Sequence, residues 1–282
     1  MLTDMVDLKD IYFSYSSKQP LFEDLSLKLE GGRIYGLLGK NGAGKTTLLK
    51  NIAGLQFVKA GSCQAFGMDS SKRNPDMLKN IYFLPEEIWL PDVTIPVYVK
   101  MYAPSWPTFN YDYFHYCLSE FDIRPDVRLK KMSFGQRKKF AISYAMATRA
   151  RLLMLDEPTN GLDIPSKSKF RKLAAELMED NRCIVLSTHQ VRDLETLIDT
   201  VIILENSKIL LNKTIDQVCD KLFFDIITSL DQPKGVLFSE LTPKGFSVIM
   251  NNPEHLESKI DLEALFNMCI EQPETINHLF NL

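Results

Sequence analysis

Residues 39–46, with the sequence GKNGAGKT, constrain this chain more than any other feature. They fit the phosphate-binding pattern G-x-x-x-x-G-K-[ST] at every fixed position. The apolar residues 33–38 before the loop predict a buried strand, and residues 47–54 after it predict a helix that ends at a glycine. The loop therefore joins a strand to a helix, the context this motif requires, and we expect it to bind the phosphates of a nucleoside triphosphate.

The chemistry of this loop depends on its backbone and on two side chains. Glycines let the chain curl around a phosphate so that its N–H groups point inward, and the helix N-terminus adds positive potential. Lys45 is expected to reach the β- and γ-phosphates, while the Thr46 hydroxyl binds Mg²⁺. A glycine turn without a ligand is the alternative, and the flanking strand and helix argue against it. The predicted phosphate-loop residues are Gly39, Lys40, Asn41, Gly42, Ala43, Gly44, Lys45, Thr46 and Thr47.

Composition narrows the class of protein. Of the 282 residues, 45% are hydrophobic and 24% are charged, as in soluble globular proteins. The net charge of −3 gives no electrostatic case for binding nucleic acid. The N-terminus lacks the apolar run of a signal peptide, and no segment has the roughly 18 apolar residues of a membrane span. If the protein works at a membrane, another chain is expected to supply the membrane part.

The apolar runs predict an α/β protein. We expect a P-loop NTPase core with a mixed sheet, an antiparallel N-terminal β-subdomain, an inserted helical subdomain and a small α+β C-terminal extension. The N-terminal strands are expected at residues 5–13 and 21–29, with a turn at 16–20. The core is expected to have buried strands at 81–84, 152–155 and 183–187, a helix at 162–180, and a closing hairpin of residues 201–204 and 209–211.

Two regions follow from this pattern. Residues 1–215 are expected to form the nucleotide-binding domain, with the helical subdomain at about 87–146, and residues 216–282 the C-terminal extension. The extension could support a homodimer, bind a regulator or cap the core, and we favour dimer support. It is expected to contain strands near 222–229, 236–240 and 245–250 and helices at 261–269 and 273–280.

Two carboxylates end a second buried strand. Four apolar residues, 152–155, are followed by Asp156 and Glu157. Such a strand places Asp156 beside the phosphate loop, where it can hold Mg²⁺ through water. Glu157 is then positioned as a base for the attacking water. A buried strand with an acidic end at the surface is the alternative, which the presence of the phosphate loop disfavours.

Further motifs carry a resemblance to a known family. Ser133 and Gln136 fit a helix capping box, which is the simplest interpretation of that segment alone. With the other motifs in order, however, the chain resembles the ATP-binding cassette (ABC) ATPases over about residues 5–215. Ser133-Phe134-Gly135-Gln136 is similar to the family signature, usually L-S-G-G-Q. The other matches are Tyr15 to the adenine-stacking aromatic, residues 160–163 to the D-loop and His189 to the switch histidine.

The resemblance implies a mechanism. Two such domains, a second copy or a homologous cassette, pair head to tail and sandwich two ATP molecules. The signature of one copy closes over the γ-phosphate held by the other, and ATP hydrolysis reopens the pair. The implied catalytic residues are Glu157, His189 and Lys45. The implied ATP-binding residues outside the phosphate loop are Tyr15, Glu86, Ser133, Gly135, Gln136 and Asp163, and the implied Mg²⁺-binding residues are Thr46, Asp156 and Glu86.

The chain departs from the family pattern in two places. Phe134 stands where the signature usually has glycine, and Met132 where it has leucine. Glu86 stands where the family usually has a glutamine, and it adds negative charge near the triphosphate unless Mg²⁺ or a neighbour offsets it. Our hypothesis is that Glu86 fills that position and couples nucleotide state to a partner. In the resembling family, the helical subdomain has a groove that receives a helix of the membrane subunit, and Trp89, which follows the Glu86 segment, is the best candidate for that groove.

The resemblance favours the ATPase subunit of an ABC transporter with separate transmembrane permease subunits, peripheral at the cytoplasmic face of the cell membrane. Glu86, residues 159–163 and the single cassette favour the drug- and lipid-export type. The alternatives are a soluble ABC ATPase acting on ribosomes or DNA, and a regulator without turnover. A run of basic residues flanks the signature. We expect these residues to form a solvated helix face that also favours a nearby triphosphate, rather than a patch that binds nucleic acid. They are Arg124, Arg128, Lys130, Lys131, Arg137, Lys138 and Lys139.

Overall fold

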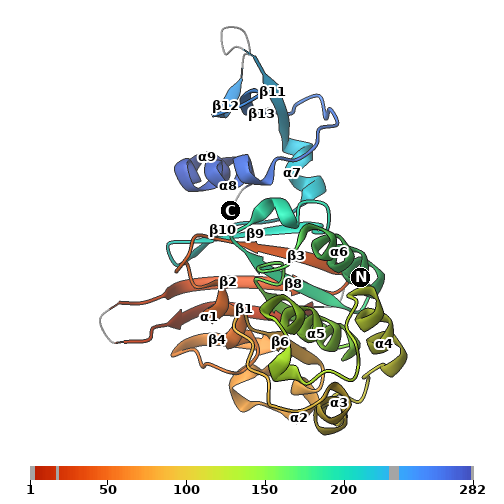
Figure 1. Cartoon of the computed structure of the whole chain (residues 1–282). Coiled ribbons are helices and arrows are strands. Elements are labelled where there is room, and N and C mark those ends of the chain that lie inside the picture. Colours follow the sequence, from red (N-terminus) through yellow and green to blue (C-terminus); the bar gives the residue numbers. More distant parts are fainter. Residues whose placement is uncertain (1–3, 17–18, 229–234, 281–282) are drawn as a thin grey trace.

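The computed structural model describes residues 4–16, 19–228 and 235–280 of the chain (Figure 1). Within these ranges the strands form a four-stranded, a six-stranded and a three-stranded sheet. The six-stranded sheet forms the centre of the nucleotide-binding region. As expected, the fold is α/β with a mixed central sheet and a separate antiparallel N-terminal sheet.

The N-terminal sheet has the strand order β2-β1-β4-β5 and is antiparallel throughout. The predicted antiparallel pair of residues 5–13 and 21–29 is confirmed as β1 and β2. The predicted turn at 16–20 includes residues 17–18, which lie outside the described residues. The strands of this sheet are β1 (Asp4–Phe13), β2 (Phe22–Glu30), β4 (Ala60–Ala65) and β5 (Met68–Asp69).

The central sheet has the order β10-β9-β3-β8-β7-β6. Strands β6, β7, β8, β3 and β9 are parallel, and β10 returns antiparallel to β9. Leu38 pairs with Thr188 and Asp156 with Ser187, so the carboxyl ends of β3, β7 and β8 lie side by side. The strands are β3 (Arg33–Leu38), β6 (Ile81–Leu84), β7 (Leu152–Asp156), β8 (Cys183–Thr188), β9 (Thr200–Glu205) and β10 (Lys208–Thr214).

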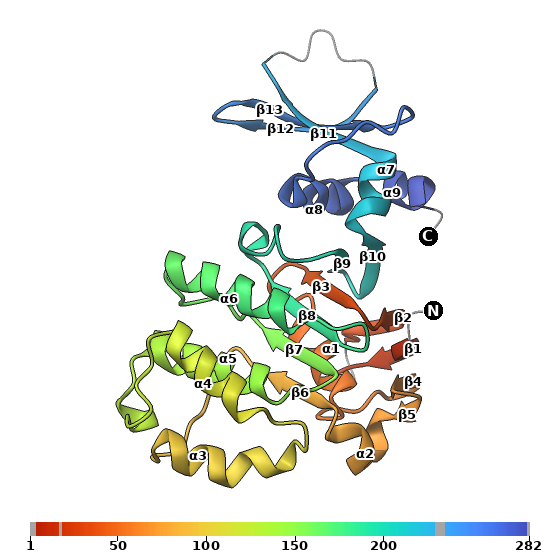
Figure 2. The same ribbon diagram turned by 90° about the vertical axis from the view of Figure 1, so that its right-hand side faces the viewer.

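The central sheet is buried on both faces. Alternate residues of β3 enter two different hydrophobic clusters, Ile34 and Leu38 in one and Tyr35 and Leu37 in the other. One face is covered by α1 (Lys45–Ile52) and the N-terminal sheet, and the other by α5 (Phe134–Ala147) and α6 (Ile164–Leu177), as Figure 2 shows. Burial on both faces explains why the core strands are continuous apolar runs.

The helical subdomain lies beside the β6 edge and packs around aromatic side chains (Figure 2). Tyr144 of α5 meets Tyr98 and Phe109 at ring-centroid distances of 5.1 and 5.2 Å. Most of the aromatic residues of this region are therefore core residues, whereas Trp89 is 78% exposed. The remaining helices here are α3 (Ile95–Tyr102) and α4 (Tyr111–Glu120), while α2 (Pro75–Leu78) precedes β6 and lies outside the subdomain.

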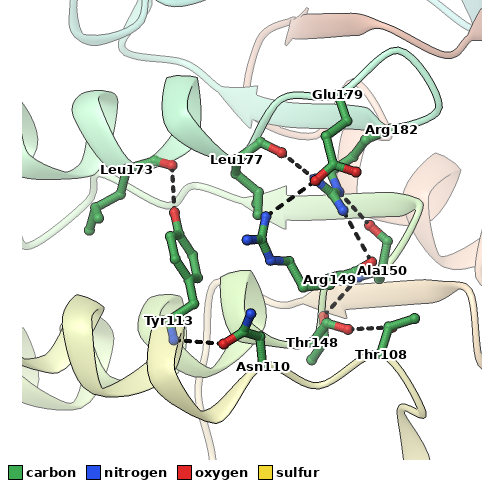
Figure 3. Close-up of polar contacts among 10 residues, drawn as sticks. All are labelled: Thr108, Asn110, Tyr113, Thr148, Arg149, Ala150, Leu173, Leu177, Glu179 and Arg182. Carbon is green, nitrogen blue, oxygen red and sulfur yellow. Dashed lines mark hydrogen bonds and ion pairs between the residues drawn. The ribbon is translucent and has the colours of Figure 1, made fainter.

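Polar contacts fasten this subdomain to the core (Figure 3). The Tyr113 hydroxyl of α4 donates to the Leu173 carbonyl oxygen of α6 at 3.0 Å. Arg182, which is 4% exposed, donates to the carbonyl oxygens of Leu177, Ala150 and Arg149. One guanidinium group thus joins the end of α6 to the segment between α5 and β7.

The C-terminal segment continues from β10 and lies at that edge of the central sheet (Figures 1 and 2). Its antiparallel sheet has the order β11-β13-β12, and α8 and α9 lie between it and β10. The predicted strand at 222–229 ends at Ile227, and residue 229 lies outside the described residues. The elements are α7 (Ile215–Lys221), β11 (Leu222–Ile227), β12 (Val236–Thr242), β13 (Gly245–Asn251), α8 (Leu262–Glu271) and α9 (Pro273–Phe280).

In the described part of the chain, none of the helices combines the length and the apolar character needed to cross a bilayer.

Candidate functional site

The phosphate loop lies between β3 and α1, and its glycines are required by the backbone. Gly42 and Gly44 have φ angles of +84° and +104°. A Cβ atom at Gly39 would lie 2.5 Å from the Leu204 carbonyl oxygen, so the loop has no room for a side chain there. Helix α1 begins at Lys45, and no side chain caps it. The first N–H groups of α1 therefore remain available to an anion.

Lys45 folds back over this loop. Its Nζ donates to the carbonyl oxygens of Gly39 at 2.7 Å and Lys40 at 3.2 Å. Burial lowers the pKa of Lys45, and the nearby carboxylates of Glu157 and Asp156 act in the opposite direction. The ammonium group is thus held between the loop and the two carboxylates that end β7.

Thr46 and Asp156 meet directly. The Thr46 hydroxyl donates to Asp156 Oδ2 at 2.6 Å, and the Ser187 hydroxyl donates to Asp156 Oδ1. Asp156 is 2% exposed. One hydroxyl and one carboxylate beside a phosphate loop suit Mg²⁺, which commonly takes few protein ligands together with phosphate oxygens and water. Among the described residues, no group of three or more His, Cys, Asp and Glu side chains could hold a metal ion.

Glu157 and His189 form a second polar contact at the same edge of the sheet. Glu157 Oε1 accepts from the His189 backbone N–H at 2.9 Å and lies 2.7 Å from His189 Nδ1. Glu157 Oε2 accepts from the Thr188 hydroxyl at 3.1 Å. Glu157 has a φ angle of +46°, an uncommon conformation for a residue with a side chain. This conformation and both oxygens are fixed by the end of β8.

Tyr15 lies beside the phosphate-loop helix. Its hydroxyl is 2.7 Å from Thr47 Oγ1, and its ring meets the edge of Phe13 at 5.0 Å. The side chain is 66% exposed. A ring exposed next to the phosphate loop has a free surface on which a planar base can stack.

Glu86 is tied to the segment that follows β7. Its Oε1 accepts from Asn160 Nδ2 at 2.9 Å. Among the described residues, no hydrogen bond joins Glu86 to Thr46 or Asp156. Its predicted place in the Mg²⁺ site, through a water molecule, stays a prediction.

The signature residues lie apart from the phosphate loop of the same chain. Ser133 and Gln136 form the capping box at the start of α5, with bonds of 3.0 and 3.2 Å. Within the described ranges, no hydrogen bond or ion pair joins them to residues 39–47. Asp163 caps α6 by accepting from the Ser166 N–H at 2.8 Å, which lowers the pKa of its carboxyl group. The predicted site residues therefore form two groups. Residues of the first contact one another beside the phosphate loop, and those of the second, Ser133, Gln136 and Asp163, lie at the starts of α5 and α6.

The structure corrects one interpretation and adds residues. Lys138, predicted to lie on a solvated helix face, is 1% exposed, because this position of α5 packs against the Glu86 segment, whose carbonyl oxygen accepts from Lys138 Nζ at 3.4 Å. Asn160, Ser187 and Thr188 were not predicted as site residues, although Asn160 belongs to the predicted D-loop and the three contact Glu86, Asp156 and Glu157 respectively. Ser187 and Thr188 end the parallel strand next to β7, and this position was the signal for them in the sequence.

Comparison with known proteins identifies the family. A family model described as ABC transporter matches residues 22–160. The ABC transporter ATP-binding protein NatA of Bacillus subtilis is 30% identical over 227 residues, covering 73% of this chain and 88% of NatA. The chain belongs to the ABC transporter ATP-binding family. It is therefore an ATP-binding ATPase, and it is a transporter subunit.

Other relatives agree with this ABC assignment. The ABC transporter ATP-binding protein YtrB of Bacillus subtilis is 27% identical over 257 residues, covering 85% of this chain and 87% of YtrB. The solved structure of an ATP-binding subunit of an ABC transporter aligns with a TM-score of 0.69 and 24% identity, covering 76% of this chain and 91% of that one. At 24% identity, this similarity to a solved structure shows the fold alone.

Proposed function

We propose that this ABC ATPase is the motor of an exporter and works as a head-to-tail dimer with a second copy or a homologous cassette. The observation that carries the dimer is the lack, among the described residues, of any hydrogen bond between the signature and the phosphate loop. Thr46 contacts Asp156 and His189 contacts Glu157, whereas Ser133 lies at the exposed start of α5 and its side chain bonds only within its own capping box in the described part of the chain. If the signature binds ATP, it must therefore contact an ATP molecule that the phosphate loop of another chain holds.

The roles of the residues follow from their positions. The N–H groups of residues 39–46 and Lys45 bind the triphosphate, and Tyr15 stacks on adenine. Thr46 and Asp156 hold Mg²⁺, which supplies positive charge against the phosphate oxygens. Glu157 accepts the proton of the attacking water. Among the described residues, both oxygens of Glu157 find their partners at Thr188 and His189 and none in the phosphate loop, so this base is oriented from the β8 side.

His189 orients the base and faces the γ-phosphate. Its Nδ1 contacts Glu157, and 38% of its side chain is exposed. The rest of the ring is therefore open to a nucleotide. Ser133, Gly135 and Gln136 of the other cassette close over the γ-phosphate from the start of α5, and Asp163 shapes the segment beside them.

The membrane side of the motor is proposed to lie at Glu86 and Trp89. Trp89 is 78% exposed and follows Glu86 closely, so a permease helix that packs on Trp89 lies near the Glu86–Asn160 bond. Permease movement would then reach the hydrolytic site through Glu86. An ATPase coupled in this way lies at the cytoplasmic face of a membrane and is bound to separate permease subunits, not to nucleic acid. Glu86, residues 159–163 and the single cassette support export.

A test compares wild type with Glu157→Gln. Because the amide cannot accept the proton, ATP turnover should fall by about 100-fold or more. ATP should still bind and should shift Glu157→Gln from monomer to dimer on size exclusion with light scattering. Ser133→Arg in the Glu157→Gln background is the matched control. It should bind ATP but stay monomeric, because the signature no longer closes on phosphate. Equal dimerisation of both variants would refute the head-to-tail arrangement.

A further inference from the structure

Lys138 is a buried lysine that the mechanism above leaves without a role. It lies in the second turn of α5, five residues after Ser133, and is 1% exposed. Its Nζ donates to the Glu86 carbonyl oxygen at 3.4 Å. Lysine is almost never fully buried unless it is paired, so this position needs an explanation beyond packing.

The charges around Lys138 belong to the catalytic site. Burial lowers the pKa of Lys138, while the carboxylates of Glu86, Asp156 and Glu157 act in the opposite direction, that of Glu86 most strongly. Within the described part of the chain, Lys138 makes no direct ion pair with a carboxylate. The ammonium group of Lys138 is buried whereas the Glu86 carboxylate reaches solvent, so the positive charge acts through space on a partly solvated partner.

Glu86 lies where two other motifs meet. Its carboxylate accepts from Asn160 of the D-loop, and its carbonyl oxygen accepts from Lys138 of the signature helix. The Glu86 side chain is exposed and carries a negative charge near the site of a triphosphate. A cation on the buried side of this segment can offset that charge without blocking the nucleotide.

We propose that Lys138 is a positioning residue that offsets the charge of Glu86 and holds the Glu86 segment against the signature helix. It is the neighbour that allows a glutamate to stand where the family usually has glutamine. This inference rests on the proposed place of Glu86 beside the nucleotide. Lys138 lies in α5, and Ser133 caps the start of this helix. The contact between Lys138 and Glu86 therefore links the ATP site of one cassette to the signature that this cassette presents to the ATP site of the other.

The test is a double-mutant cycle with full-length protein. Lys138→Gln leaves Glu86 uncompensated, so the Kd for a fluorescent ATP analogue with Mg²⁺ and the KM for ATP should rise about tenfold. Glu86→Gln in the Lys138→Gln background removes the opposing charge and should return both constants to within about threefold of wild type. Glu86→Gln alone gives the effect of the amide with Lys138 in place, and it is the reference against which the double variant is compared. The matched control is Lys130→Gln, an exposed lysine that loses the same charge, and it should leave both constants unchanged.

Each outcome decides the proposal. Recovery by Glu86→Gln supports it, because loss of packing alone would not be repaired by a change at Glu86. An equal defect in the single and double variants overturns it, as does a Lys138→Gln variant that behaves like Lys130→Gln. If Lys138→Gln does not fold, a folded, ATP-binding double variant supports the charge pairing, and an unfolded one refutes it. Failure of the dimer mechanism would show separately, as a Glu157→Gln variant that binds ATP without dimerising.

Discussion

At the scale of single residues, the side chain of Glu157 is held at both of its oxygens. Its two oxygens are held by different partners, His189 on Oε1 and Thr188 on Oε2. A general base works well only when its lone pair is aimed at the water it deprotonates. Thr188 has no bond to the phosphate loop in the described part of the chain, so its contribution to hydrolysis should be separable from ATP binding.

Thr188→Val tests this separation. Valine keeps the shape of threonine but removes the hydroxyl that donates to Glu157. A hydrogen bond to a charged group contributes about 1.5–3 kcal/mol, so kcat should fall by about tenfold or more while KM stays within about twofold. Steady-state ATPase measurements give both constants. Thr196→Val, on the segment after β8, is the control and should change neither. A rise in KM with unchanged kcat would show that Thr188 supports binding instead.

At the scale of elements, the junction around Arg182 joins the end of α6 to the segment between α5 and β7 (Figure 3). The three carbonyl oxygens that it satisfies come from Leu177, Ala150 and Arg149. Glu179, whose Oε1 lies 3.2 Å from Arg182 Nη1, balances the charge. The C-terminal ends of α5 and α6 are thus fixed to each other.

Arg182→Met should therefore destabilise the protein more than an ordinary arginine substitution. It leaves buried carbonyl groups without a donor, and the free energy of unfolding should fall by about 3 kcal/mol. Urea unfolding followed by circular dichroism measures this change. The control is Arg124→Met, whose guanidinium is exposed and, within the described ranges, pairs with Asp126 alone, and it should cost less than about 0.5 kcal/mol. Equal costs for the two variants would show that the junction contributes no special stability.

Some of the elements could be predicted from the sequence, and others could not. Core strands were predictable because burial on both faces makes them continuous apolar runs. Strand β4 was missed because AGSCQA has few large apolar residues and is held by pairing with β1. The residues that we propose for hydrolysis could be singled out in the sequence because each follows a strand or a glycine loop. Lys138 was misplaced because its burial depends on how α5 packs against the Glu86 segment, and that packing leaves no local pattern in the sequence.

At the scale of the whole molecule, the C-terminal segment shares a core with the nucleotide-binding region. One hydrophobic cluster contains Ile203 and Leu211 of the central sheet together with Leu222 and Leu265 of the C-terminal segment. Ion pairs join the same parts, Arg192 to Glu263 at 2.6 Å and Lys259 to Glu195 at 3.3 Å. A shared core predicts that the two parts unfold together, whatever the extension contributes to a dimer.

Both tryptophans, Trp89 and Trp106, lie before residue 215, so their fluorescence reports only the nucleotide-binding region. Leu265→Ala, at a fully buried position of α8, should lower the free energy of unfolding by about 2–5 kcal/mol. If the core is shared, tryptophan fluorescence and circular dichroism should shift together to lower urea concentration. Leu241→Ala on β12 is the control, since Leu241 is 77% exposed and should shift neither signal. If the circular dichroism signal shifted while the tryptophan transition stayed in place, residues 216–282 would be an independent domain.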